Sequence, residues 1–215
     1  LGTGLVEYIG GPQFAHLLLG PLENLAVVEE TVVREKACDS INQLAGIMSD
    51  QQIQTFYLPL LHRLSSGEWF TSRTSAALLF ASVYEKIPLS MRADVHSMFV
   101  SLCTDETPMV RRAAARDMSA LVKRMSPEVI INEMLPLYRR LSADDQDSVR
   151  LLTVQNLVAM AEVLSPAETQ QLLLSSICGA FQDKSWRVRY MAADNFVQLA
   201  TAVGEDVVKE DLVPA

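Results

Sequence analysis

Residues 183–196 read DKSWRVRYMAADNF, a polar turn followed by apolar residues at helical intervals. The second arginine of this stretch belongs to a series that recurs at intervals of 39, 38, 39 and 39 residues: Arg34, Arg73, Arg111, Arg150 and Arg189. The segments around the other four arginines read EETVVREKAC, EWFTSRTSAA, ETPMVRRAAA and QDSVRLLTV. An internal repeat of this length is typical of solenoids, whose stacked units share one continuous core.

The residues after each arginine predict the second helix of a repeat. Three, seven and ten positions later come a small, a large and an apolar residue, which lie on one helical face. These positions are Ala37, Ala76, Ala114, Thr153 and Ala192; Ile41, Phe80, Met118, Leu157 and Phe196; and Leu44, Val83, Leu121, Met160 and Leu199. Upstream, Pro21, Pro59 and Pro136 lie within apolar stretches that predict the first helix, which each proline should kink. We therefore expect an all-α solenoid of antiparallel helix pairs.

Glycine, proline and serine mark where one helix pair ends and the next begins. Gly10-Gly11-Pro12, the segment around Pro88, Ser126-Pro127 and Ser165-Pro166 divide the chain in this way. We expect a single solenoid over 1–215, with five repeats at 12–50, 51–89, 90–126, 127–165 and 166–204. Residues 1–11 are then the end of a preceding repeat and 205–215 the start of a further one. Because neither end resembles a polar capping repeat, and the first residue is Leu1, we expect an internal piece of a longer protein.

Composition limits the possible functions. Apolar residues make up 49% of the 215 positions, yet no apolar run approaches the roughly 18 residues that a membrane span requires. The formal net charge of −8 opposes binding to a polyphosphate backbone. We expect no nucleic-acid partner and no membrane partner. Three widely separated cysteines argue against a disulfide framework and a metal knuckle, and favour the reducing cytosol or nucleus.

No pattern in the sequence indicates catalysis. His16, His62 and His96 stand apart from one another, and we expect them on helix surfaces. Zinc-protease, serine-hydrolase, phosphate-loop and CxxC motifs are missing. The acidic run at Asp144, Asp145 and Asp147 lacks the ligand spacing and glycine of a calcium loop, so a solvated turn is the simpler interpretation. We predict a non-enzyme with no catalytic residue, no cofactor and no metal site.

A structural role is the first interpretation of the repeated arginine. Asp105, Asp144 and Asp183 lie six residues before the last three arginines, which favours a ladder of acid–arginine pairs along stacked turns. We expect such pairs to be partly exposed and to contribute at most about 1 kcal/mol each. Val28 and Gly67 occupy the acidic position in the first two repeats, so the ladder should be incomplete there.

The turns between the two helices of each repeat differ most from one another. They read AVVEE, SSGEWFTS, TDETPMV, ADDQDS and DKSWRV. Large apolar side chains lie beside charges at three of them, as in interface anchors: Trp69-Phe70, Pro108-Met109 and Trp186-Arg187. Arg112 and Arg187 lie outside the repeated position and are therefore better interface candidates than Arg111 or Arg189. The alternative is that each tryptophan folds back onto its own helix pair.

The strings VEETVVREKA, EWFTSRTSA, DETPMVRRAAA, DQDSVRLL and DKSWRVRYMAADNF closely resemble consecutive HEAT repeats of the scaffolding A subunits of protein phosphatase 2A. The resemblance spans essentially the whole chain. It implies a non-catalytic platform from a horseshoe of fifteen two-helix repeats, of which this piece is similar to the end of the second through the start of the eighth. Regulatory B-type subunits then dock on these intra-repeat turns, and the catalytic subunit docks on later repeats outside the segment.

The resemblance also implies particular contact residues for a regulatory subunit. These are Glu68, Trp69 and Phe70; Thr107, Pro108 and Met109 with Arg111 and Arg112; and Trp186 and Arg187. Arg111 has a mixed role, because it is also a repeat arginine. The alternative function is that of an importin-type transport receptor, also a HEAT solenoid, which wraps protein cargo along its inner face. An enzyme ranks last, because no nucleophile–base pair can be argued from spacing.

Overall fold

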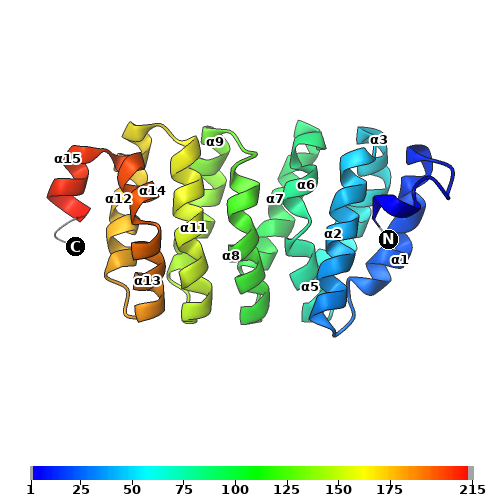
Figure 1. Cartoon of the computed structure of the whole chain (residues 1–215), viewed down its shortest axis with the longest axis horizontal. Helices are drawn as coiled ribbons and strands as arrows, with labels where there is room; N and C mark the ends of the chain where they lie inside the picture. The colour runs from blue at the N-terminus through cyan, green and yellow to red at the C-terminus, as the bar shows by residue number, and fades with distance from the viewer. Residues whose placement is uncertain (1, 213–215) are drawn as a thin grey trace. The chain divides into compact units, whose positions relative to one another are not determined.

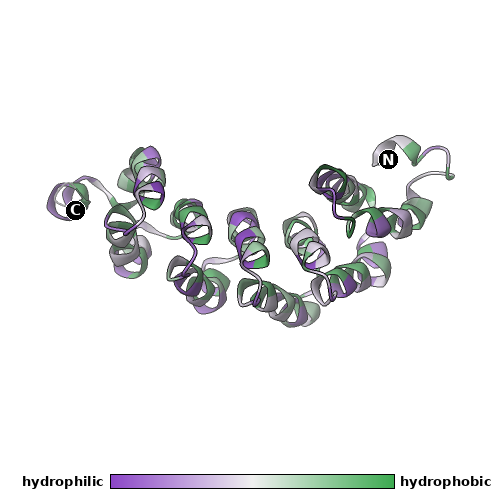
Figure 2. Cartoon of the chain, turned by 90° about the horizontal axis from the view of Figure 1, so that it is seen from below, coloured by the Kyte–Doolittle hydropathy of each residue, from purple (hydrophilic) through white to green (hydrophobic). Residues whose placement is uncertain are grey.

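The computed structural model describes residues 2–212, and its regular elements within that range are all helical (Figure 1). The chain forms two compact units, Leu1–Ala114 and Ala115–Ala215. Helix α8, Pro108–Val122, runs through the boundary between them. Within each unit the helices pack as antiparallel pairs, with first and second helices in two rows (Figure 2). The expectation of an all-α fold built from helix pairs is confirmed.

Unit 1 begins with two 3-10 segments, η1 and η2, and continues through first helices α1, α3–α4 and α7 and second helices α2 and α5–α6. The bounds are η1 Thr3–Leu5, η2 Pro12–Leu18, α1 Leu19–Leu25, α2 Thr31–Ile47, α3 Asp50–Gln52, η3 Ile53–Tyr57, α4 Leu58–Ser65, α5 Phe70–Ala77, α6 Phe80–Val83, η4 Tyr84–Lys86 and α7 Leu89–Cys103. Gly10 and Gly11, with φ of 101° and 103°, form the turn into η2, a conformation that favours glycine.

Unit 2 contains the end of α8, two helix pairs and the helical segment that follows them. The bounds are α9 Pro127–Val129, η5 Ile130–Met134, α10 Leu135–Ser142, α11 Asp147–Val163, α12 Pro166–Phe181, α13 Trp186–Asp194, α14 Phe196–Val203, α15 Glu205–Val207 and η6 Val208–Leu212. Ser165 begins α12 with a capping box in which its hydroxyl accepts from the Glu168 amide.

Each repeat arginine is the fourth residue of a second helix. The helices concerned begin at Thr31, Phe70, Pro108, Asp147 and Trp186. All the predicted positions three and ten residues after the arginine are buried, as are four of the five at the seventh position. Phe196 is half-buried and meets Phe181 edge-on, with 5.8 Å between ring centroids. The repeat period therefore predicted the core correctly.

Two of the three prolines of the first helices, Pro59 and Pro136, follow wide helical turns, whereas Pro21 in α1 follows the 3-10 segment η2. The π-helical turns η3 and η5 lie immediately before the segments that contain Pro59 and Pro136. A proline ring clashes with the carbonyl one turn earlier and removes one donor, and a π-turn supplies the extra room. The sequence predicted a distortion at these sites but not its form.

The second helix of the second repeat is interrupted between α5 and α6, and polar side chains bind the freed carbonyls. Asn42 donates to the Leu78 carbonyl at 3.0 Å, and the Tyr57 hydroxyl donates to the Leu79 carbonyl at 3.1 Å. Burial raises the pKa of Tyr57 above its ordinary value, so the hydroxyl remains a donor. The first bond connects α2 of the first repeat to the second helix of the second repeat, and the second bond connects the two helices of the second repeat.

The expectation that all three histidines lie on helix surfaces is wrong for His96. This residue of α7 is buried, and its Nε2 lies 2.8 Å from the Tyr84 hydroxyl. His62 is exposed, and His16 is half-buried and stacks on Phe56 with 4.1 Å between ring centroids. His96 could be buried because a polar partner, Tyr84, is buried beside it.

Candidate functional site at the intra-repeat turns

The five repeat arginines share one structural task. In each, Nη1 donates to the backbone carbonyls six and five residues upstream, in the turn between first and second helices. The distances from Nη1 are 2.8 and 2.6 Å for Arg34, 2.8 and 2.7 Å for Arg73, 2.7 and 3.1 Å for Arg111, 2.8 and 3.2 Å for Arg150, and 2.7 and 3.3 Å for Arg189. We call this contact the arginine clamp.

The clamp supplies donors where the backbone lacks them. The last carbonyls of a helix and of the turn after it have no intrahelical partner, and they form the negative end of the helix dipole. A guanidinium held there satisfies two carbonyls and adds a favourable charge. The turn is therefore fixed to the second helix, and the side chains that it displays are presented on a rigid backbone.

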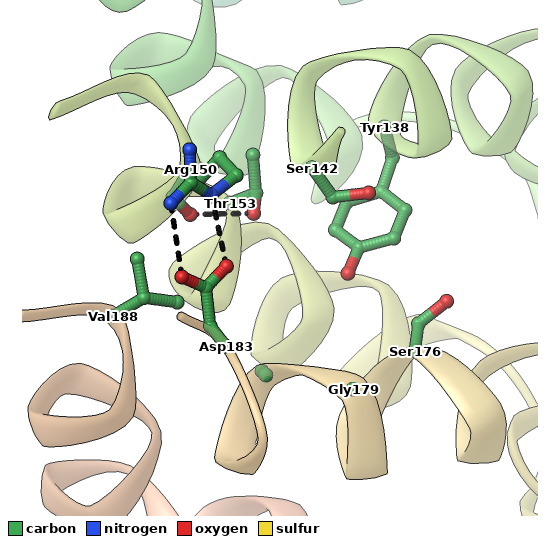
Figure 3. A pocket seen from close by; sticks show the side chains of 9 residues that line it. Tyr138, Ser142, Arg150, Thr153, Ser176, Gly179, Asp183 and Val188 are labelled. Atoms are coloured by element: carbon green, nitrogen blue, oxygen red, sulfur yellow. Dashed lines mark hydrogen bonds and ion pairs between the residues drawn. The ribbon is translucent and has the colours of Figure 1, made fainter. Parts of the chain in front are cut away.

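The remaining nitrogens of two arginines bind an aspartate of the next repeat. In unit 1, Arg73 Nε and Nη2 lie 2.6 and 3.2 Å from the Asp105 carboxylate. In unit 2, Arg150 makes the same bidentate pair with Asp183 at 2.8 and 2.9 Å (Figure 3). Each aspartate thus gives its carbonyl to its own repeat's arginine and its carboxylate to the arginine of the preceding repeat.

These pairs are more buried than the sequence led us to expect. The side chains of Arg150 and Asp183 are 5% and 14% exposed. The surface value of about 1 kcal/mol therefore does not apply, because removing one partner of a buried pair leaves the other uncompensated.

The ladder was expected to be incomplete in the first two repeats; this is correct for Arg34 but wrong for Arg73, because each paired arginine binds the aspartate of the following repeat. The position that would supply its carboxylate is Gly67, and Arg34 Nη2 donates instead to the Thr31 hydroxyl at 3.2 Å. A side chain at Gly67 would collide with the Ser72 hydroxyl, which donates to the Leu64 carbonyl at 2.9 Å. This position is therefore too closely packed for an acidic side chain.

The Arg150–Asp183 pair borders a cavity of about 170 Å³ within unit 2 (Figure 3). Its lining includes Tyr138, Ser142, Thr153 and Ser176. Burial raises the pKa of Tyr138 to about 12, so its hydroxyl is protonated at neutral pH. The hydroxyl groups of this lining lie beside the Asp183 carboxylate, which is already paired with Arg150.

Asp183 gives unit 2 a defined response to acid. Its pKa is lowered, chiefly because Arg150 donates to the carboxylate. A lowered folded-state pKa contributes stability that is fully present above the unfolded value of about 3.9 and is lost as pH falls through the folded value. We expect the difference in unfolding free energy between wild type and Asp183→Asn to be constant from pH 6 to 8 and to shrink below about pH 4. Urea titrations at pH 7 and pH 3 measure it, and a difference that grows in acid would contradict this account.

The predicted contact residues all lie at the beginning of second helices or in the turn before them. Trp69 and Trp186 are 75% and 68% exposed, so neither is buried against its own helix pair. Also exposed are Glu68, Pro108, Met109, Arg112 and Arg187, whereas Phe70, Thr107 and Arg111 are half-buried.

Two of the half-buried residues have contacts that organise the turn. The Thr107 amide donates to Asp105 Oδ1 at 2.8 Å, and its hydroxyl lies 3.4 Å from Arg73 Nη2. Arg111 forms a clamp. Their role as contacts with a partner stays a prediction.

Several further exposed residues lie on the same edge and were not among the predicted contact residues. Val32 and Tyr190 are exposed apolar side chains near the starts of α2 and α13. Glu29 and Glu106 share with Glu68 the position five residues before a repeat arginine, and all three are exposed. These acids could have been found from the sequence, because an acidic residue recurs five residues before the repeat arginine.

No group of three or more His, Cys, Asp or Glu side chains is arranged to hold a metal ion among residues 2–212. Over the same residues, no helix is both long and apolar enough to cross a membrane.

The chain is similar in sequence to known HEAT-repeat proteins. The model of the HEAT repeat family matches residues 173–203, which cover most of α12 through α14. The chain is 46% identical over 208 residues to the PP2A regulatory A subunit of Schizosaccharomyces pombe, covering 96% of this chain and 35% of the relative. It is 38% identical over 207 residues to the Saccharomyces cerevisiae protein of that name, covering 91% and 32%. The beta isoform of the human 65 kDa regulatory A subunit of phosphatase 2A is 51% identical over 121 residues, covering 56% and 20%.

The chain is a HEAT-repeat homologue of the phosphatase 2A regulatory A subunits. It spans about a third of the length of the first two relatives. Among solved structures, the karyopherin Kap121p in complex with the C-terminus of Cdc14p matches with a TM-score of 0.77 at 15% identity, covering 96% of this chain and 23% of that one. Cex1p matches with a TM-score of 0.70 at 16% identity, covering 93% and 38%. These structural likenesses show the solenoid fold alone.

Proposed function

We propose that this chain is part of a non-catalytic scaffold of a phosphatase 2A holoenzyme, and that its intra-repeat turns bind a regulatory B-type subunit. The observation that carries the proposal is the 46% identity to a phosphatase regulatory A subunit over nearly the whole chain. The catalytic subunit then binds repeats outside this segment.

The geometry of the turns supports a binding role. A scaffold has to display side chains without reacting, and solenoids do so on surfaces that repeat along the stack. Here the clamp fixes each turn, and exposed tryptophans lie next to charged residues on it. Rigid aromatic anchors lose little conformational entropy on binding, which makes them efficient contacts.

The alternative is a transport receptor of the importin type. Its support is the fold shared with Kap121p, at 14–15% identity. Identity three times higher to the phosphatase subunits favours the scaffold.

A binding experiment separates the two functions. We expect the full-length protein that carries this chain to retain the phosphatase catalytic subunit together with a purified B-type subunit in a pull-down, and not to retain a Ran-type GTPase. Replacing residues 1–215 by other repeats of the same protein should abolish retention of the B-type subunit while the catalytic subunit stays bound. Retention of the GTPase instead of the phosphatase subunits would overturn the proposal.

A further inference from the structure

The cavity of unit 2 is lined by four residues that depart from the repeat pattern. Thr153, three residues after its arginine, stands where the other four repeats have alanine. Tyr138, twelve residues before the same arginine, stands where the others have leucine, phenylalanine or isoleucine. Ser176 and Gly179 lie thirteen and ten residues before the next repeat arginine, where the other repeats have proline, leucine or methionine and asparagine, arginine or serine. Three hydroxyl groups and a missing side chain thus meet in one place.

Gly179 has no structural reason to be glycine. It lies inside α12, where glycine is less favourable than alanine because it loses more backbone freedom on folding. Its φ is not positive, and a Cβ added to it would meet no atom within 4 Å. Because Gly179 lines the cavity and is exposed, the missing side chain keeps the cavity open to solvent.

The hydroxyl groups of the lining can both donate and accept hydrogen bonds. Tyr138 points toward the helix that carries Ser176 and Gly179 (Figure 3). Burial raises the pKa of Tyr138 to about 12, so its hydroxyl is a donor at neutral pH. The hydroxyls of Ser142 and Ser176 can rotate to donate or to accept. A ligand that matches this lining therefore carries several groups that do the same.

Charge and size narrow the class of ligand. The charged residues of the lining are Arg150 and Asp183, which neutralise each other through hydrogen bonds of 2.8 and 2.9 Å. A neutral ligand therefore enters without burying an uncompensated charge. Ala180 and Val188 add apolar surface for carbon atoms. The volume of about 170 Å³ is below the roughly 300 Å³ of pockets for drug-sized molecules, which favours a ligand of a few carbon atoms.

We propose that the cavity between the fourth and fifth repeats binds a short polyol, a neutral molecule with a hydroxyl group on each of about three to five carbon atoms. Its hydroxyls exchange hydrogen bonds with Tyr138, Ser142 and Ser176, and its carbon chain lies against Val188. Because α10 and α11 line one side and α12 and α13 the other, a bound polyol links the two repeats and stabilises unit 2. None of the lining residues is a predicted contact of the regulatory subunit, so this site is separate from the proposed binding surface.

The test measures polyol binding to the full-length protein by saturation-transfer NMR, with glycerol and xylitol as probes. Gly179→Leu places a side chain at the mouth of the cavity. Gly46→Leu is the matched control, because Gly46 is also an exposed glycine inside a helix, α2, whose added Cβ would meet no atom within 4 Å. Both variants should fold, since leucine favours a helix more than glycine does.

We expect saturable binding to the wild type and to Gly46→Leu, and its loss in Gly179→Leu. Tyr138→Phe keeps the ring but removes the hydroxyl, and it should weaken binding by about three- to tenfold, the loss expected for one hydrogen bond. Hydrogen exchange in α10 and α12 should slow with polyol in the wild type but not in Gly179→Leu. This difference separates binding at the site from the general exclusion of polyols from protein surfaces, which acts on all variants alike.

Two results would overturn the site: no saturable binding by the wild type, or equal binding by the wild type and Gly179→Leu. Loss of binding in both leucine variants would overturn it as well, because the effect would not depend on the cavity. Glycerate, the anionic counterpart of glycerol, should bind more weakly than glycerol. Tighter binding of glycerate would overturn the assignment of a neutral ligand.

Discussion

Arg150→Ala lowers the free energy of unfolding of unit 2 by about 3 kcal/mol, the loss expected when a buried ion pair is broken from one side. Asp183 loses a bidentate partner, and the carbonyls of Asp144 and Asp145 lose their side-chain donor. Arg150→Lys should restore only part of this loss, because a single ammonium cannot reach the carboxylate and both carbonyls at once. Urea unfolding and hydrogen exchange across α11 and α13 measure the effect.

Arg63→Ala is the matched control for this prediction. Arg63 also makes two hydrogen bonds to a carboxylate of a neighbouring repeat, both at 2.7 Å to Glu23, but its side chain is 57% exposed. An exposed pair contributes about 1 kcal/mol or less, so this variant should unfold nearly like the wild type. Equal losses for the two variants would show that burial of the clamp does not determine its contribution.

Trp69→Ala and Trp186→Ala each weaken binding of a regulatory subunit by about 2 kcal/mol, or about thirtyfold, if these side chains are central anchors. Stability should change by less than about 0.5 kcal/mol, because both side chains are mostly exposed. Arg112→Ala should weaken binding less, since its exposed charge is screened. Calorimetric titration of the full-length protein, paired with thermal unfolding, separates binding from stability.

Leu89→Ala is the control for a general loss of exposed apolar area. Leu89 is exposed at the start of α7 and lies away from the intra-repeat turns. It should leave both affinity and melting temperature unchanged. A tryptophan variant that keeps its affinity but melts many degrees lower would identify that tryptophan as a structural residue of its own repeat.

Much of the fold could be predicted because the repeat fixes the register of many residues at once. Arg73 and Arg150 share their spacing with the small and apolar residues that follow, and this spacing identified the second helices and their buried faces. The turn residues could be predicted as exposed for the opposite reason. Trp69 and Trp186 break the pattern, and a side chain that differs between repeats is not required by the common core.

Contacts between repeats could not be predicted in the same way. Sequence distance placed Asp183 nearest its own arginine, Arg189, whereas its carboxylate binds Arg150 of the preceding repeat. The stacking of neighbouring repeats determines which arginine the Asp183 carboxylate binds. The burial of His96 depends on Tyr84, and the π-turn before Pro59 depends on how its helix adjusts to a missing donor. Each of these features arises from packing, which helical periodicity does not specify.

Oxidative footprinting of the full-length protein with and without a bound B-type subunit tests the central claim, since tryptophan and methionine report directly on the turns. We predict that Trp69, Met109 and Trp186 become protected in the complex. Exposed apolar side chains elsewhere, such as Leu89, Phe14 and Val100, should keep their reactivity. Protection of these latter residues with unchanged oxidation of the tryptophans would contradict the assignment of the intra-repeat turns as the binding surface.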